Sequence, residues 1–135
     1  MTQEDKNLLL KDLCSRLPYG VIIQEYNEEY GYVDNALNTI GIGYFSIHEA
    51  CIEGTWINHI ENVKPYLRPL SSMSEKEKEE YYTIIIRSQG CSFENGESAT
   101  TTVNDWLLSK HFDVRGLISK GLAIAVTKEN NPYKD

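Results

Sequence analysis

The chain has 135 residues, 41% of them hydrophobic and 24% charged, as expected for one globular domain at 1–135. With 20 acidic and 13 basic residues its formal net charge is −7, which argues against binding along a nucleic-acid backbone. No apolar run reaches the ~18 residues of a membrane span, and the polar residues 1–5 do not resemble a signal peptide. Three scattered cysteines do not describe a disulfide framework. We therefore expect a cytoplasmic protein with reduced thiols and no membrane contact.

Residues 2–17 are predicted to form an amphipathic helix. Thr2 and Asp5 have the spacing of a capping box, in which each side chain accepts a hydrogen bond from the other residue's backbone N–H. Apolar residues then recur at three- and four-residue steps: Leu9, Leu10, Leu13, Cys14 and Leu17. Pro18 ends the helix. Because Cys14 is in this apolar series, we expect a buried thiol rather than a nucleophile.

Residues 19–63 show the pattern of short strands separated by turns. Strands are expected at 20–26, 30–33, 40–47 and 54–60, and the turn of a hairpin at 27–29. Such strands predict a small curled antiparallel sheet or a partly open barrel. Gly41 and Gly43 suit sharp curvature better than phosphate binding, because no helix opens after them.

A hinge at 64–74 separates this β-rich part from a helical part. Pro65 and Pro69 fix their own backbone angles and favour an extended residue before each of them. Ser74 and Glu77 then have the spacing of a second capping box, which predicts the start of a helix.

The helical part is expected at 75–121. Its elements are a helix at 75–88, a loop at 89–98, a helix opened by a capping box of Thr102 and Asp105, and a short helix capped by Asp113 and ended by Gly121. In the tail at 122–135, residues 122–126 suit an edge strand, and residues 128–135 are expected to fray. The predicted fold class is α+β, with an N-terminal helix, a small sheet and C-terminal helices.

Three stretches carry a resemblance to known proteins: LCSRLPYGV at 13–21, KPYLRPLSSM at 64–73 and DWLLSKHFDVRGLI at 105–118, the last followed by KGLA at 120–123. In this order they resemble a family of small uncharacterised proteins of Bacteroides-type gut bacteria and of their prophages and phages. The resemblance implies an intracellular, phage-linked accessory protein and no particular chemistry. Residues 24–56 do not take part in this resemblance. We expect binding specificity in the sheet that they form, because the segments before and after them are the ones that resemble the family.

Catalytic and metal-binding patterns are weak. His48, Cys51 and His59 are zinc-ligand types, but they lack a second close pair and a fourth ligand. Glu49 and Glu53 suit solvated carboxylates better than a general acid–base pair. No nucleophile elbow, phosphate-binding glycine loop or His-Glu-x-x-His sequence occurs. We therefore predict a non-catalytic protein with no metal and no cofactor.

Six residues are candidates for ligand or partner binding: Tyr66, Arg68, Trp106, Lys110, His111 and Arg115. The cations near His111 are suited to grip an anion such as a nucleotide phosphate, with a Tyr or Trp ring stacked on its base. The structural alternative is that Asp113 caps a helix beside an exposed Arg115, and that the hinge residues form a strap between layers.

Two functional hypotheses follow. The first is a phage- or prophage-linked binding protein that acts on a host protein and whose acidic surface meets a basic partner. The second is a small-ligand binder that sequesters a nucleotide signal. Assembly into a homo-oligomer is open under either hypothesis.

Overall fold

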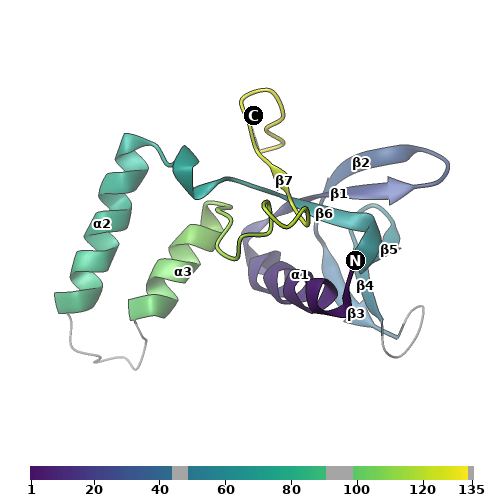
Figure 1. The fold of residues 1–135 in the computed structure, drawn as a ribbon, viewed down its shortest axis with the longest axis horizontal. Coiled ribbons are helices and arrows are strands. Elements are labelled where there is room, and N and C mark those ends of the chain that lie inside the picture. The colour runs from purple at the N-terminus through teal and green to yellow at the C-terminus, as the bar shows by residue number, and fades with distance from the viewer. Residues whose placement is uncertain (44–48, 91–98, 134–135) are drawn as a thin grey trace.

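The computed structural model describes residues 1–43, 49–90 and 99–133 and has an α+β fold. Helix α1 (Gln3–Arg16) lies beside two small sheets, and helices α2 (Glu75–Gly90) and α3 (Ala99–Ser109) extend to one side (Figure 1). The predicted fold class is confirmed, but the sheets do not close into a barrel. In the described part of the chain, no helix is long and apolar enough to cross a membrane.

Helix α1 begins as the sequence predicts. The Asp5 backbone N–H donates to Thr2 Oγ1 at 3.0 Å, and the Thr2 N–H donates to Asp5 Oδ2 at 3.4 Å. A 3-10 turn, η1 (Leu17–Tyr19), follows the helix. Leu13 is fully buried, but Cys14 is exposed, so the prediction of a buried thiol is wrong. The two side chains are adjacent in sequence and therefore point about 100° apart around the helix.

The first sheet has four strands in the order β2 (Gly31–Ala36), β1 (Ile22–Asn27), β6 (Val63–Leu67) and β7 (Ile124–Ala125). β1 pairs antiparallel with both of its neighbours, which confirms the predicted hairpin. β7 forms the predicted edge strand but runs parallel to β6, so the sheet is mixed rather than antiparallel throughout. The long connection through α2 and α3 permits this parallel pairing, which a short turn cannot provide.

The second sheet has three antiparallel strands in the order β3 (Thr39–Ile42), β4 (Ala50–Glu53) and β5 (Ile57–His59). β3 is an edge strand that contains Gly41, one of the two glycines that the sequence analysis associates with curvature. The later part of the strand predicted at 40–47 falls outside the described residues. β4 was not predicted from the sequence. It has only four residues, one of them charged, and so short a segment shows too little alternation of apolar and polar residues to identify a strand.

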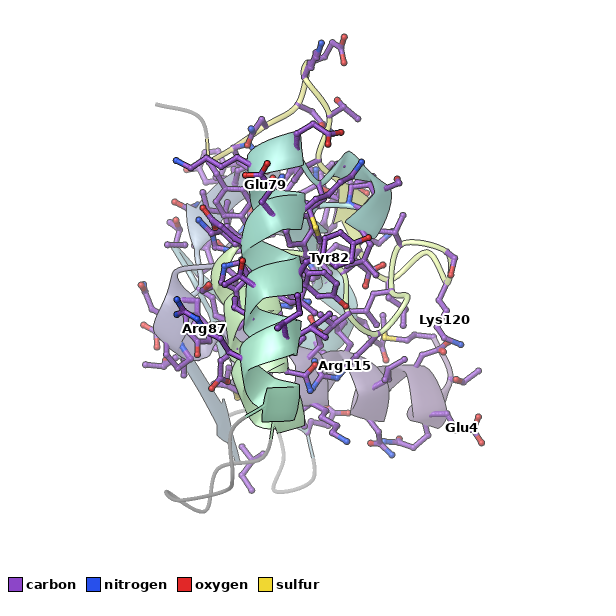
Figure 2. The ribbon with its side chains drawn as sticks, turned by 90° about the vertical axis from the view of Figure 1, so that its left-hand side faces the viewer. Glu4, Glu79, Tyr82, Arg87, Arg115 and Lys120 are labelled. Carbon is purple, nitrogen blue, oxygen red and sulfur yellow. The ribbon has the colours of Figure 1, made fainter. Side chains whose placement is uncertain are left out.

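The hinge leads from β6 through a 3-10 turn, η3 (Leu70–Ser72), into α2. The second capping box is confirmed: the Ser74 N–H donates to Glu77 Oε1 at 3.0 Å, and the Glu77 N–H donates to Ser74 Oγ at 3.1 Å. No residue of α2 from 75 to 87 is buried. Figure 2 looks onto the outer face of this helix, where Glu79, Tyr82 and Arg87 are labelled.

Two helix predictions in the C-terminal part are wrong. α3 begins at Ala99, so Thr102 and Asp105 lie inside the helix rather than at its start. Asp113 does act as a cap, because its carboxylate oxygens accept the backbone N–H groups of Leu117 at 2.9 Å and Ile118 at 3.0 Å. The segment that follows forms turns instead of a helix. Gly116, at φ 71°, has a backbone angle that a right-handed helix does not contain.

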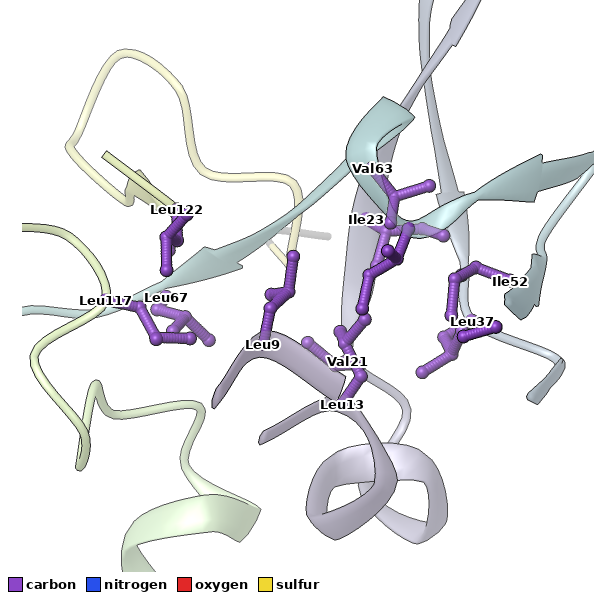
Figure 3. Packing of buried hydrophobic residues seen from close by; sticks show 13 residues of the cluster. Leu9, Leu13, Val21, Ile23, Leu37, Ile52, Val63, Leu67, Leu117 and Leu122 are labelled. Carbon is purple, nitrogen blue, oxygen red and sulfur yellow. The ribbon is translucent and has the colours of Figure 1, made fainter. Parts of the chain in front are cut away.

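The hydrophobic core lies between α1 and the sheets and also takes residues from the segment after α3 (Figure 3). Ten side chains at most 5% exposed are labelled there: Leu9, Leu13, Val21, Ile23, Leu37, Ile52, Val63, Leu67, Leu117 and Leu122. Because β4 and β6 both contribute, one core joins the two sheets.

The C-terminal tail does not fray as predicted up to residue 133, and 134–135 lie outside the described residues. The Tyr133 hydroxyl accepts the Ile22 N–H at 3.0 Å and donates to the Tyr66 carbonyl at 2.7 Å. It thereby bridges β1 and β6 just beyond their last paired residues. Burial raises the pKa of Tyr133 to about 12, so the hydroxyl keeps its proton at neutral pH.

Candidate functional site

The β1–β2 hairpin projects at the end of the molecule opposite to α2 (Figure 1). Its strands pair over six residues each. Asn27 fixes the turn, because its Oδ1 accepts the backbone N–H groups of Glu29 at 2.8 Å and Tyr30 at 3.2 Å. Gly31 completes the turn with φ 75°. The hairpin is therefore a defined support for the side chains that it carries.

Four aromatic side chains gather at this hairpin, and we call Tyr26, Tyr30, Tyr32 and Trp56 the aromatic cluster. Tyr26 and Tyr32 face each other across the strands with ring centroids 5.2 Å apart. Tyr30 stacks on Trp56 with centroids 5.9 Å apart and planes 3° from parallel. Tyr26 is 39% exposed, and Tyr30 and Tyr32 are each 69% exposed. Much aromatic surface thus faces solvent.

A surface pocket of about 310 Å³ lies beside the first pair of rings. It is lined by Tyr26 and Tyr32 together with polar residues: Gln24, Glu61, Asn62 and Lys64. Glu61 forms an ion pair with Lys6 of α1 at 2.5 Å, and its pKa is lowered by that contact. The pocket therefore combines ring faces with amide, ammonium and carboxylate groups.

A buried carboxylate holds the base of the hairpin against the second sheet. Glu25 of β1 is fully buried and accepts hydrogen bonds from the backbone N–H groups of Thr55 at 2.9 Å and Trp56 at 3.2 Å, and from Asn58 Nδ2 at 3.2 Å. A Cβ atom at Gly54 would lie 2.6 Å from Glu25 Oε2, so a glycine is needed there. These contacts position Trp56 under Tyr30.

Of the six sequence-predicted site residues, Tyr66 lies in β6 and is only 6% exposed. Its hydroxyl donates to Asp34 Oδ1 at 2.7 Å and accepts a longer bond from Gln24 Nε2 at 3.4 Å. Burial and the bond to Asp34 raise the pKa of Tyr66 to about 12. The side chain therefore links three strands of the first sheet.

Arg68 is part of a packed corner. Its guanidinium donates to both carboxylate oxygens of Glu77, at 2.7 and 2.6 Å, and lies 4.2 Å from the centroid of the Phe112 ring. The bonds from Arg68 are the main reason that the pKa of Glu77 falls to about 2. The strap interpretation describes these contacts well, since they fasten α2 to the segment after α3.

Arg115 belongs to the same corner and is not the exposed side chain that the sequence suggests. Its guanidinium donates to Asp12 Oδ1 at 2.9 Å and to Ser15 Oγ at 3.1 Å. Asp12 also accepts from the fully buried Arg16 at 2.7 Å, and Arg16 donates to the Phe112 carbonyl at 2.7 Å. We call the three arginines, with Asp12, Glu77 and Phe112, the arginine corner.

The remaining predicted residues surround this corner. His111 stacks on Tyr133 with ring centroids 3.9 Å apart. Burial, with smaller effects of Arg16 and Arg68, lowers the pKa of His111 to about 4, so the ring is neutral at neutral pH. Trp106 packs between Tyr81 and Phe112, with centroids 6.0 and 6.1 Å away. Lys110 is half-buried, and its carbonyl faces Arg68 Nη1 at 3.5 Å.

The weak metal pattern is not strengthened by the geometry. Among the described residues, no group of three His, Cys, Asp or Glu side chains could hold a metal ion, and His48 falls outside them. Cys51 is buried opposite His59 on the neighbouring strand, and His59 Nδ1 lies 2.9 Å from Glu49.

The sequence predictions missed the aromatic cluster as a site. A signal was present, since three tyrosines flank one turn within seven residues, between Tyr26 and Tyr32. The alternation of side chains along the sequence predicted strands here, but it did not show which faces of the tyrosine rings remain exposed to solvent.

Comparisons of the chain with known protein families, with curated proteins and with solved structures found no match.

Proposed function

We propose that this chain is a non-catalytic binding protein that acts on a host protein, and that the aromatic cluster is its contact surface. The observation that carries the proposal is the high exposure of Tyr30 and Tyr32, each 69%, on a hairpin with a hydrogen-bonded turn. Tyrosine supplies a large contact area with few rotatable bonds, so a preordered tyrosine loses little conformational entropy on binding.

Charge suggests the chemistry of the partner. The chain has a net charge of −7, and Glu28 and Glu29 occupy the turn between the tyrosine-bearing strands. An arginine-rich surface would gain cation–π contacts with the rings and attraction to these carboxylates. We therefore propose a basic host protein in the cytoplasm as the partner, in the phage-linked context that the sequence resemblance implies.

The arginine corner gives less support to the alternative, a small anionic ligand. Arg68 and Arg115 already donate to carboxylates of this chain, and His111 carries no charge at neutral pH. A phosphate would have to displace Glu77 or Asp12, which would leave a carboxylate without its arginine.

The test is capture from a lysate of Bacteroides-type bacteria, followed by titration of the captured protein in solution. We expect Tyr30→Ala/Tyr32→Ala to lower its affinity by about a hundredfold, as for two interface hot spots. Leu70→Ala, at a large side chain 49% exposed in η3 and away from the hairpin, is the control and should leave the affinity unchanged. Affinity should also fall as salt is added.

Equal affinity of the double variant and the wild type would overturn the assignment of the aromatic cluster. A captured partner with an acidic surface, or binding that is indifferent to salt, would overturn the proposed chemistry of the partner. Circular dichroism of each variant confirms that the loss of binding is not a loss of fold.

A further inference from the structure

Helix α2 is attached to the molecule along one side and open along the other. Its inner side contacts the rest of the chain through Glu77, which binds Arg68, and Tyr81, whose ring lies 6.0 Å from that of Trp106. On the outer side, Tyr82 is 61% and Ile86 is 68% exposed. Two large apolar side chains one helical turn apart form an apolar strip that faces solvent. Figure 2 looks onto this face and labels Tyr82.

Side chains of opposite charge flank this strip, Glu79 before it and Arg87 after it. Glu79 and Arg87, both exposed, stand four residues before and four residues after Thr83. With the helical rise, each lies about 6 Å along the axis from Thr83. A twofold axis that is perpendicular to the helix and level with Thr83 would therefore bring Glu79 of one copy to the height of Arg87 of the other.

We infer that the outer face of α2 binds the same face of a second copy of this chain, with the two helices antiparallel. In that arrangement Glu79 of each copy lies level with Arg87 of the other, and Tyr82 lies about 3 Å along the helix axis from Ile86 of the other. Such an interface is isologous, because one self-complementary patch serves both subunits. The inference does not depend on the proposed function of the aromatic cluster.

Charge favours a second antiparallel copy over the other arrangements. The first half of α2 is mainly acidic, with four glutamates and two lysines among residues 75–80, and Arg87 lies in its last turn. Parallel copies would place the acidic halves together, whereas antiparallel copies separate them and also oppose the two helix dipoles. A strongly basic or acidic foreign partner would meet a like charge at one end of the face.

The dimer would have a defined shape. α2 and the β1–β2 hairpin lie at opposite ends of the long axis of the molecule (Figure 1). Pairing through α2 would therefore place the two aromatic clusters at the far ends of the dimer, as two separate binding surfaces.

Sedimentation equilibrium of the full chain tests the inference. The wild type should form a concentration-dependent dimer, and Ile86→Asp should remove it. Ile42→Asp is the matched control, because Ile42 is an isoleucine 72% exposed on β3, and it should dimerise like the wild type. A monomeric wild type at all concentrations, or equal loss in both variants, would overturn the inference.

A charge exchange tests the orientation. Glu79→Arg should weaken the dimer by about tenfold, because each dimer contains two Glu79–Arg87 pairs and both become repulsive. Glu79→Arg/Arg87→Glu should restore the dimer to near wild-type strength. Failure of the double variant to restore it, with helix content unchanged by circular dichroism, would exclude the antiparallel arrangement.

Discussion

The arginine corner and the aromatic cluster use similar kinds of side chains in opposite ways. In the corner, the arginines are held by carboxylates, by a carbonyl and by the Phe112 ring. In the aromatic cluster, the rings are fixed in place while most of the surface of Tyr30 and Tyr32 stays open. The difference teaches that chemical type alone does not mark a binding site. What marks it is a side chain held in place without being covered.

Asp12→Ala should have the largest effect, because it removes the shared acceptor of Arg16 and Arg115 and leaves the fully buried Arg16 without its carboxylate. We expect a loss of about 3–5 kcal/mol in the free energy of unfolding, measured by urea titration. Asp105→Ala, at an exposed position of α3, is the control and should change stability by less than ~0.5 kcal/mol. A similar small loss for Asp12→Ala would show that the corner is not a structural unit.

Arg115→Ala should cost about 2 kcal/mol, because the substitution removes two hydrogen bonds, one of them to a buried carboxylate. Lys120→Ala, at an exposed position in the turns after α3, is the control and should leave the melting temperature nearly unchanged. Partner affinity of the folded Arg115 variant should equal that of the wild type. The reverse result, an unchanged melting temperature with lost affinity, would make the corner a binding site.

Glu77 should give the corner a pH dependence. Its folded pKa of about 2 lies below the reference value of 4.5, so its stabilisation is complete above pH 4.5 and is lost as the pH falls toward 2. Glu77→Gln should lower the free energy of unfolding at pH 7 by about 1.5 kcal/mol. Urea titrations between pH 2 and 7 should show a weaker pH dependence for this variant than for the wild type. Equal pH dependence of the free energy of unfolding in the variant and the wild type would contradict the low pKa of Glu77.

Tyr30→Ala/Tyr32→Ala should have the smallest effect on the fold. Both rings are mainly exposed, so we expect a change in the free energy of unfolding of less than about 1 kcal/mol, measured by thermal melting. Tyr66→Phe, which removes the buried bond to Asp34, is the contrasting variant and should cost about 1 kcal/mol. A double variant that unfolds would show that the aromatic cluster serves stability.

Local patterns predicted much of the fold. The capping boxes at Thr2 and Ser74, which mark the starts of α1 and α2, depend on residues three apart in the sequence, and both form. The hairpin follows from the alternation on each side of Asn27. The errors arise where contacts far apart in sequence decide the result. The position of Arg115 depends on Asp12, 103 residues away, and no local pattern contains that distance.

The candidate site was predictable only in outline. Binding specificity was expected within 24–56, and that range contains the whole aromatic cluster. The individual rings could not be chosen, because alternation assigns residues to two faces of a strand without showing which face will be covered. Arg68 differs from these rings: its charge suggests a ligand, but both carboxylate oxygens of Glu77 accept hydrogen bonds from its guanidinium.

The hydroxyl of Tyr133 has a consequence for how the chain reaches its native state. It joins the two strands of the central pair by bonds that reach back 111 residues to Ile22 and 67 residues to Tyr66. During synthesis, the first sheet therefore cannot complete its hydrogen bonding until residue 133 has left the ribosome. Because contacts between such distant residues slow folding, the nascent chain should remain exposed to chaperones and proteases longer than a helical protein of equal length.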